Sequence, residues 1–340
     1  MSIPPRSRRR PLPSDRRKRG KGSNILRRKR MKSRYFRISV NASCNLACAF
    51  CHNEGQGTIS RRDRRQLSID SIVWVSRIAR EEGFEKFKLT GGEPTLRPDL
   101  CELVRRLRAE GIDELSMITN GIRLGKLARP LREAGLPRIN VSLHTLDEAR
   151  FCRDFGGEPS QLRRIVAGID RAIAEGYREM KINLVYGGPQ PTEDLRRVLD
   201  FVAQRDLVLV LLPELPFGTS LDLEAASLRS LYRLLTRWGI RSERMLEDRE
   251  GIRKRLILLE GGGRVLLRDD ELGEKLPYSA CLRCIRRSEC REGIFPVRFH
   301  ADGTLHPCLA DGLPATPLAE AIERRDASAV RRAMQGITHS

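Results

Sequence analysis

The chain has 340 residues, of which 40% are hydrophobic and 32% charged, a composition typical of a globular protein. No apolar run is long enough to span a bilayer, so we expect neither a membrane protein nor a secreted one, and a cytoplasmic location. The formal net charge is +20, but residues 1–34 hold 15 Lys and Arg against a single acid, Asp15. The rest of the chain is only mildly basic, which argues against a fold built to grip nucleic acid.

The first 33 residues are rich in Arg, Lys, Pro and Ser and lack hydrophobic periodicity. This pattern predicts a disordered basic arm over residues 1–33. Two interpretations of the arm stay open, a solvated tail and a tether for RNA or an acidic partner.

From residue 34 onward, short β-rich runs alternate with stretches of helical periodicity. The predicted strands are Tyr35–Val40, Phe87–Thr90, Leu115–Thr119, Ile139–Leu143, Lys181–Tyr186 and Leu207–Leu212. The predicted helices between them cover residues 68–82, 97–110, 123–134, 160–175 and 191–204. Such alternation predicts an α/β fold with a parallel sheet, and six units are too few for a closed eight-unit barrel. We therefore predict a partial (β/α)6 TIM-like barrel over residues 34–244.

The pattern changes near residue 245. One more helix is predicted over 223–238, followed by a hairpin around Gly261–Gly263 and a second around Ala301–Gly303. Cysteines surround the second hairpin, and a terminal helix is predicted over 316–336. These features predict a small cysteine-rich extension over residues 245–340.

Seven of the nine cysteines fall into two tight groups, which in a reducing compartment indicates metal. The first group, Cys44, Cys48 and Cys51, lies on the loop after the first predicted strand, with the spacing C-x-x-x-C-x-x-C. Three thiolates on one short loop can hold three irons of a cubane cluster and leave the fourth iron open. Zinc is the alternative, because His52 could supply a fourth ligand.

The first strand and this triad resemble the radical S-adenosylmethionine (SAM) enzymes. The resemblance implies a [4Fe-4S] cluster with SAM on its open iron, and a 5′-deoxyadenosyl radical that abstracts hydrogen from the substrate. Gly91, Gly92 and Glu93, which follow the second strand, resemble the family segment that binds the amino group of SAM. By the same resemblance Thr119 and Ser142, at the next strand ends, line the SAM site, although ordinary turn chemistry explains them equally well.

The second cysteine group combines Cys281, Cys284 and Cys290 with the more distant Cys308. Its D-G-x-L-x-P-C-L ending resembles the auxiliary-cluster domain of the GTP 3′,8-cyclase family, which acts in molybdenum-cofactor biosynthesis. The resemblance implies a second, auxiliary [4Fe-4S] cluster held by Cys281, Cys284 and Cys308. Cys290 lies in an insertion relative to the cyclases, and its ligation stays open. Structural zinc is the alternative, because four cysteines would make a closed site.

The resemblance to the cyclases also implies a set of basic residues around an anionic substrate. These residues are Arg37, Lys86, Lys88, Lys181 and Arg298. Two departures argue against cyclase activity itself and for a paralogue. Pro296 stands where the cyclases have a second Arg, and the chain ends without their Gly-Gly tail.

Three functions follow from these observations as hypotheses. The first is a radical SAM enzyme that rearranges or cyclises a nucleotide or another small anionic metabolite, with flavodoxin or ferredoxin as electron donor. The second is a radical SAM maturase of a ribosomally made peptide. The third is a zinc-containing nucleic-acid-binding protein that uses the basic arm. We rank the third last, because it leaves the Gly-Gly-Glu segment unexplained, and we expect no nucleic-acid contact beyond the arm.

Overall fold

Strand β1 (Arg34–Ser39) shows how the sequence pattern creates two different faces of the sheet. In the computed structural model, Phe36 and Ile38 have no exposed surface, whereas Tyr35 and Arg37, which alternate with them, are half-buried on the opposite face. Successive side chains of a strand point to opposite faces, so this alternation places one apolar and one polar face on the same strand. The apolar face packs against helices, and the polar face is free to carry a site.

The structure describes residues 34–52, 66–186, 192–213, 228–247, 253–268, 296–309 and 314–338. The predicted basic arm, together with Cys281, Cys284 and Cys290, lies outside these residues. No helix among the described residues is long and apolar enough to cross a membrane.

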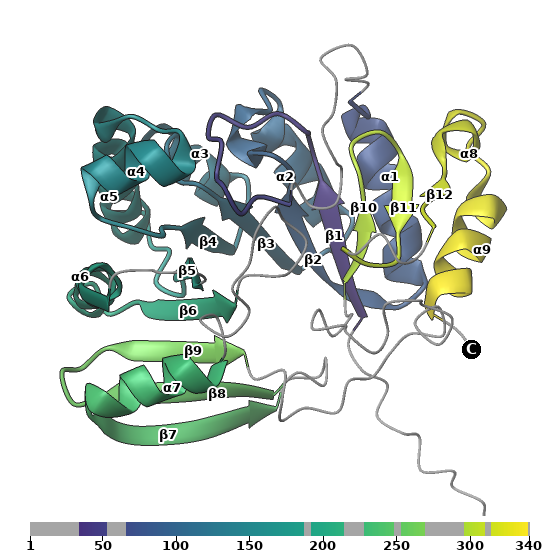
Figure 1. Cartoon of the computed structure of the whole chain (residues 1–340). Coiled ribbons are helices and arrows are strands. Elements are labelled where there is room, and N and C mark those ends of the chain that lie inside the picture. Colours follow the sequence, from purple (N-terminus) through teal and green to yellow (C-terminus); the bar gives the residue numbers. More distant parts are fainter. Residues whose placement is uncertain are drawn as a thin grey trace, which may run out of the picture. The chain divides into compact units, whose positions relative to one another are not determined.

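Twelve strands form one sheet, in the order β12-β11-β10-β1-β2-β3-β4-β5-β6-β9-β8-β7 (Figure 1). Besides β1 they are β2 (Phe84–Thr90), β3 (Glu114–Thr119), β4 (Arg138–Ser142), β5 (Lys181–Tyr186), β6 (Val208–Pro213), β7 (Ile240–Glu247), β8 (Arg253–Leu259), β9 (Arg264–Arg268), β10 (Pro296–Phe299), β11 (Thr304–His306) and β12 (Thr316–Pro317). Strands β1 to β6 follow one another in chain order and are all parallel. The sheet has two ends, β12 and β7, so the barrel is open, and the predicted partial barrel is confirmed.

Helices connect the parallel strands and cover their apolar face (Figure 1). The helices of the described residues are α1 (Ile69–Glu81), the short 3-10 helix η2 (Pro94–Leu96), α2 (Leu100–Ala109), α3 (Leu124–Glu133), α4 (Glu148–Phe155), α5 (Pro159–Ala174), α6 (Thr192–Ala203), α7 (Leu228–Arg237) and, after the last strand, α8 (Ala319–Glu323) and α9 (Ala327–Thr338). Local chemistry sets the boundaries; the Ser68 hydroxyl, for example, accepts the Ser71 amide at the start of α1. Buried residues of the helices and strands form one continuous core.

Two predictions of secondary structure need correction. Helix α4 did not emerge from the periodicity, because eight residues give too few turns for a clear pattern. The single terminal helix predicted over 316–336 is instead β12 followed by α8 and α9. Arg325 has a φ of 55°, which interrupts the helix, and the Asp326 side chain then caps α9 by accepting the Ala329 amide.

The strands of the predicted extension join the barrel sheet at both ends. Strand β10 pairs in parallel with β1, and β9 pairs in parallel with β6. The predicted boundary at residues 244 and 245 falls inside β7, and the division into two domains stays a prediction. The consequence for the site is direct, because β10 brings Arg298 and the hairpin before Cys308 next to the first strand.

Candidate active site

The loop after β1 carries Cys44, Cys48 and Cys51. Cys44 and Cys51 are exposed and Cys48 is half-buried, and the Cys51 amide donates to the Cys48 carbonyl at 3.0 Å. Burial, together with the charges of the neighbouring thiols, raises the pKa of Cys48 to about 12. Partial removal of its thiol from water also raises the pKa of Cys44, although the residue as a whole is exposed. Neighbouring thiolates repel one another, and the positive charge of bound iron would offset that repulsion and favour their ionised form.

The proposed fourth zinc ligand, His52, is exposed. The three cysteines lie on one short loop, and three thiolates are the donor set of a cubane cluster with one open iron, whereas a closed tetrahedral zinc site needs a fourth ligand.

The two glycines after β2 are required by close backbone contact. A Cβ on Gly91 would lie 2.4 Å from the Asn41 carbonyl, and one on Gly92 would lie 2.4 Å from the Ser43 carbonyl. The Gly92 amide donates to Asn41, and the Glu93 amide donates to Ser43. The glycines thus hold the base of the cysteine loop against the end of β2, which places the two segments side by side.

The Glu93 carboxylate is fully buried and accepts hydrogen bonds from within the protein. The amide and hydroxyl of Thr95 and the hydroxyl of Thr119 donate to one oxygen, and the Asn120 amide donates to the other at 2.7 Å. Burial raises the pKa of Glu93, and these hydrogen bonds oppose the rise. The Glu93 and Thr119 side chains therefore tie β2 to β3. Their predicted roles toward SAM stay predictions.

Asn120, which follows the predicted SAM residue Thr119, links the end of β3 to the cysteine loop. Its side-chain amide donates to the Asn45 side chain at 2.8 Å, directly beside Cys44. The signal was present in Thr119-Asn120-Gly121 at a strand end, but only the fold reveals Asn45 as the partner.

A pocket opens beside Cys48 at the carboxyl ends of β3 and β4. It holds about 300 Å³ of empty space, partly open to solvent, and its lining is mostly apolar. The lining residues are Leu46, Cys48, Asn120, Ser142, Leu143, His144, Phe151 and Phe155. The predicted SAM residue Ser142 thus reaches the same space as a cysteine of the triad.

His144 is a half-buried neutral histidine in this pocket. Its Nδ1 accepts the Val185 amide at 3.0 Å, and its ring stacks on Phe155 with centroids 5.4 Å apart. Burial and, to a smaller extent, the Arg150 charge together lower the pKa of His144 to about 3. The imidazole consequently stays uncharged near neutral pH.

We expect His144 to make the fold sensitive to acid. In the unfolded chain a histidine titrates near pH 6.5, so unfolding takes up about one extra proton between pH 6.5 and about 3. The stability of the iron-free protein should therefore fall as the pH drops below 6.5. The melting temperature should fall more steeply with decreasing pH in wild type than in His144→Asn, because Asn keeps an acceptor for the Val185 amide but does not titrate. Parallel curves from pH 7 to pH 4 would contradict this assignment.

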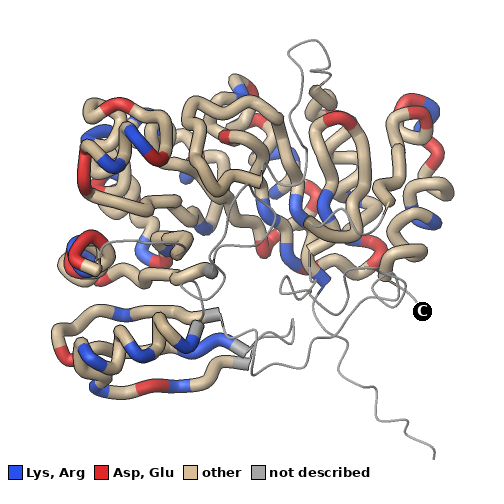
Figure 2. The backbone as a smooth tube through the Cα atoms, in the orientation of Figure 1, with Lys and Arg blue, Asp and Glu red and all other residues tan. Residues whose placement is uncertain are grey.

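Three basic residues stand in one row on the polar face of the sheet. Arg37 on β1 is in register with Arg298 on β10 and with Lys88 on β2. Figure 2 shows Lys and Arg positions, in blue, along the central strands of the sheet. Register neighbours in parallel strands point to the same face, so the three side chains share the inner side of the barrel. Arg298 is only 1% exposed, and Lys88 lies over the Tyr35 ring.

Further cations extend this row toward β5. Lys181 is half-buried, and its pKa is lowered by burial and then by the charges of Lys254, Lys88 and Arg138. Arg138 and Lys254 were not predicted, since nothing local distinguishes them among the 64 Lys and Arg of the chain. Lys86 lies two residues before Lys88 and on the same face, in register with Glu114. The structure thus brings all five predicted basic residues to one face of the sheet.

Comparison with known proteins assigns the region that carries the cysteine loop. Residues 38–202, which contain the cysteine loop, the Gly-Gly-Glu segment and the pocket, match the Radical SAM superfamily. This region is a radical SAM domain. A radical SAM domain implies a [4Fe-4S] cluster and SAM, and Cys44, Cys48 and Cys51 are the donor set that fits the cluster.

Several relatives of the radical SAM domain are named as GTP 3′,8-cyclases. A probable GTP 3′,8-cyclase of Metallosphaera sedula is 37% identical over 211 residues, which are 61% of this chain and 65% of the relative. GTP 3′,8-cyclase 1 of Pseudomonas aeruginosa is 38% identical over 54% of this chain and 55% of its own length. The relative in Methanococcus vannielii is 29% identical over 81% of this chain and 84% of its own length. The chain thus spans less than two thirds of the first two relatives.

Solved structures agree on the fold. SuiB of Streptococcus suis, solved with bound S-adenosylmethionine, superposes with a TM-score of 0.61 at 19% identity, covering 91% of this chain and 68% of SuiB. The structure of anSMEcpe with bound AdoMet gives a TM-score of 0.52 at 16% identity, covering 81% of this chain and 74% of its own. At these identities the likeness is one of fold.

The second cysteine group is described only at Cys308, which is 3% exposed. It follows β11, where His306 is in register with Arg298 across the hairpin. The rings of His300 and His306 stack with centroids 4.0 Å apart. Cys281, Cys284 and Cys290 lie outside the described residues, so the auxiliary site stays a prediction.

Proposed function

We propose that the chain is a radical SAM enzyme that acts on a small anionic metabolite, held on the polar face of the barrel by Arg298, Arg37 and Lys88. One observation carries this proposal. Three cations in register, one of them buried, share a face of the sheet with Lys181, whose pKa is lowered by burial and then by the charges of Lys254, Lys88 and Arg138. A phosphate or carboxylate among these side chains would form charge-assisted hydrogen bonds with them.

The residues around the cysteine loop divide the remaining tasks. When bound, the cluster and SAM supply a 5′-deoxyadenosyl radical that removes a hydrogen atom from the substrate. Cys44, Cys48 and Cys51 would hold the cluster, and Gly91 and Gly92 keep the end of β2 against their loop. The apolar lining of the pocket beside Cys48 disfavours water near the cluster loop, which would limit side reactions of a radical. Basic side chains on the strands orient the substrate.

We further propose an auxiliary [4Fe-4S] cluster held by Cys281, Cys284 and Cys308. Buried Cys308 next to the Arg298 row supports it, since an auxiliary cluster there would border the anion site. If Cys290 is not a ligand, replacing it with Ala should leave the iron content unchanged. Loss of one cluster's iron in Cys290→Ala would make it the fourth ligand.

The substrate should carry fewer charges than GTP. Pro296 pairs with Tyr35 on β1, and its carbonyl accepts a hydrogen bond from the Arg298 guanidinium. The proline side chain has no hydrogen-bond donor for a substrate phosphate. A triphosphate left short of one bidentate partner in a closed site loses on the order of a few kcal/mol. A nucleoside monophosphate, a sugar phosphate or a carboxylated metabolite fits the remaining cations better.

A product screen tests this proposal. Reduced, reconstituted protein should consume a monophosphate or carboxylate substrate and leave GTP unconverted, and Pro296→Arg alone should not create cyclase activity. Chromatography of reactions with GTP and with smaller anions measures both outcomes. Efficient conversion of GTP to the 3′,8-cyclised product by the unmodified chain would refute the substrate class.

The alternatives gain less support. The likeness to SuiB, which was also solved with its precursor peptide SuiA, is one of fold at 18% identity, so it does not favour a peptide substrate. The hypothesis of a zinc-containing nucleic-acid-binding protein predicted a chain without a SAM site, and the match of residues 38–202 to the Radical SAM superfamily contradicts that hypothesis. A flavodoxin or ferredoxin remains our proposal for the electron donor.

A further inference from the structure

Helix α4 contacts the cysteine loop through its last carbonyl groups. The Ala47 amide donates to the Phe155 carbonyl at 2.9 Å, and the Ala49 amide donates to the Asp154 carbonyl at 3.0 Å. Carbonyls in the last turn of a helix have no partner within the helix, so they are available to the loop. Gly156 follows in the left-handed conformation, and a Cβ there would lie 3.0 Å from the Ala47 side chain. The C-terminal end of α4 thus holds the loop backbone on either side of Cys48.

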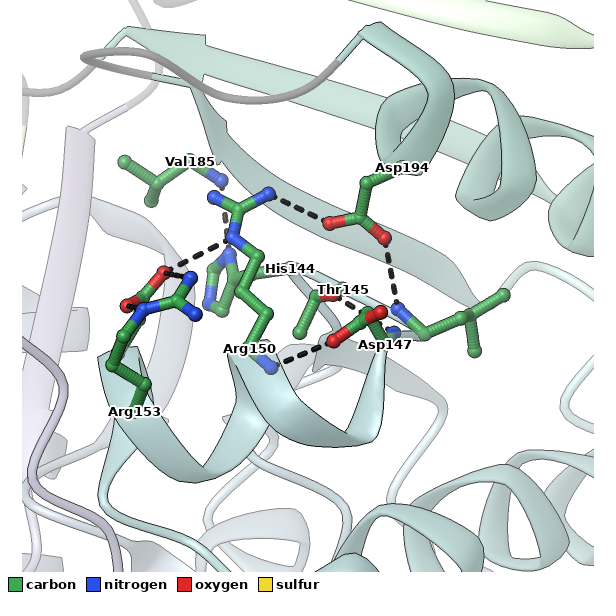
Figure 3. Close-up of polar contacts among 9 residues, drawn as sticks. His144, Thr145, Asp147, Arg150, Arg153, Val185 and Asp194 are labelled. Carbon is green, nitrogen blue, oxygen red and sulfur yellow. Dashed lines mark hydrogen bonds and ion pairs between the residues drawn. The ribbon is translucent and has the colours of Figure 1, made fainter.

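One side chain anchors α4 to the barrel. Arg150 Nη1 donates to Asp194 on α6 at 2.6 Å, while its Nε donates to Asp154 at 3.1 Å (Figure 3). The Asp194 side chain is 6% exposed and that of Arg150 14%, so the pair is largely removed from water. Asp194 also accepts the Leu146 amide, just before α4 begins. Arg150 therefore links Asp194 on α6 to Asp154 at the end of α4, and the Asp154 carbonyl accepts the Ala49 amide of the loop.

Aromatic rings extend the contact to the pocket. Phe155 stacks on His144, and Phe50, which lies between Cys48 and Cys51 in the chain, meets the edge of His144 at 4.9 Å between centroids. The amide of Val185 on β5 donates to the His144 ring and fixes it to the barrel. Phe50 of the cysteine loop packs on the same ring, so the aromatic group connects the barrel to the loop. A shift of α4 would move the wall of the pocket and the loop together.

We propose that the buried Arg150–Asp194 ion pair is a positioning device for the cysteine loop. It fixes α4, and α4 in turn holds the amides of Ala47 and Ala49 and the ring of Phe50. The proposal rests on the assignment of the three cysteines as cluster ligands. Arg150 and Asp194 touch none of the cysteines, so they act through the helix as positioning residues rather than catalytic ones.

The test compares the buried pair with an exposed pair on the same helix. Asp194→Asn and Arg150→Gln each leave one buried partner without its counter-charge, whereas Arg163→Gln removes the exposed 2.5 Å ion pair from α5 to Glu148 on α4. Iron release from the reconstituted protein to a chelator should be faster by about tenfold or more in the two buried variants, the range typical of outer-sphere substitutions. Arg163→Gln should release iron at the wild-type rate. Arg150→Lys, which keeps the charge, should recover part of the loss.

A second readout separates positioning from simple destabilisation. Hydrogen exchange of the iron-free protein should accelerate in the peptide covering residues 44–52 and remain unchanged in β2 and β3. The double variant Arg150→Gln with Asp194→Asn should be no worse than either single variant, because the two groups act as one unit. Wild-type iron release and wild-type exchange of the loop in the single variants would overturn the proposal. Failure of the wild-type chain to hold any cluster would instead overturn the proposed function.

Discussion

Replacing Cys44, Cys48 and Cys51 together with Ala is expected to abolish formation of 5′-deoxyadenosine. The same variant should lose about four irons per chain, the content of one [4Fe-4S] cluster. The fold should survive, because Cys44 and Cys51 are exposed and Cys48, which packs against the edge of the core, loses only its sulfur atom on replacement by Ala. Iron analysis after anaerobic reconstitution and chromatographic detection of 5′-deoxyadenosine measure the two effects.

A solitary cysteine offers the matched control for the triad. Cys101 lies on α2, partly buried against the core and away from the loop, so Cys101→Ala should keep both iron and SAM cleavage. Normal SAM cleavage by the triple variant would end the assignment of the triad. Loss of iron in Cys101→Ala as well would point to a damaged fold rather than to lost ligands.

Arg37→Ala is expected to uncouple SAM cleavage from substrate turnover. Arg37 stands between Arg298 and Lys88 in the row, and removing one partner of a charged hydrogen-bonded contact costs about 2–5 kcal/mol. Turnover should therefore fall by roughly 30-fold or more. Abortive formation of 5′-deoxyadenosine should continue, because the cysteine loop and the pocket beside Cys48 do not include Arg37. The ratio of product to 5′-deoxyadenosine reports the uncoupling directly.

Arg298 and Arg129 complete this experiment. Arg298→Lys retains the charge at the buried position but loses the planar fork, so it should uncouple in the same direction as Arg37→Ala. Arg129 on α3 forms an exposed pair with Glu133, and its replacement by Ala should leave the ratio unchanged. An unchanged ratio in Arg37→Ala and Arg298→Lys would exclude this face of the sheet as the substrate site.

Much of the barrel could be read from the sequence because its signals are local. The alternation of Phe36 and Ile38 with Tyr35 and Arg37 predicts a strand with two unlike faces, and β5 occupies the predicted range Lys181–Tyr186. The cysteine spacing likewise sits within eight consecutive residues, so it predicts a cluster loop without any knowledge of the fold. Short elements escaped for the same reason, since α4 is too brief for its period to stand out.

The sequence by itself determined the strand–helix order, the triad and the Gly-Gly-Glu segment, since each depends on residues close together in the chain. Only the tertiary structure decided that Arg298 lies beside Arg37, which is far from it in sequence, and that Arg138 and Lys254 belong to the same cationic group. It also decided that the Glu93 carboxylate faces Thr119 and that Arg150 reaches Asp194. These contacts join strands and helices that are distant in the chain. The packing of the sheet and its crossover helices determines them, because no local sequence pattern specifies which distant side chain becomes a neighbour.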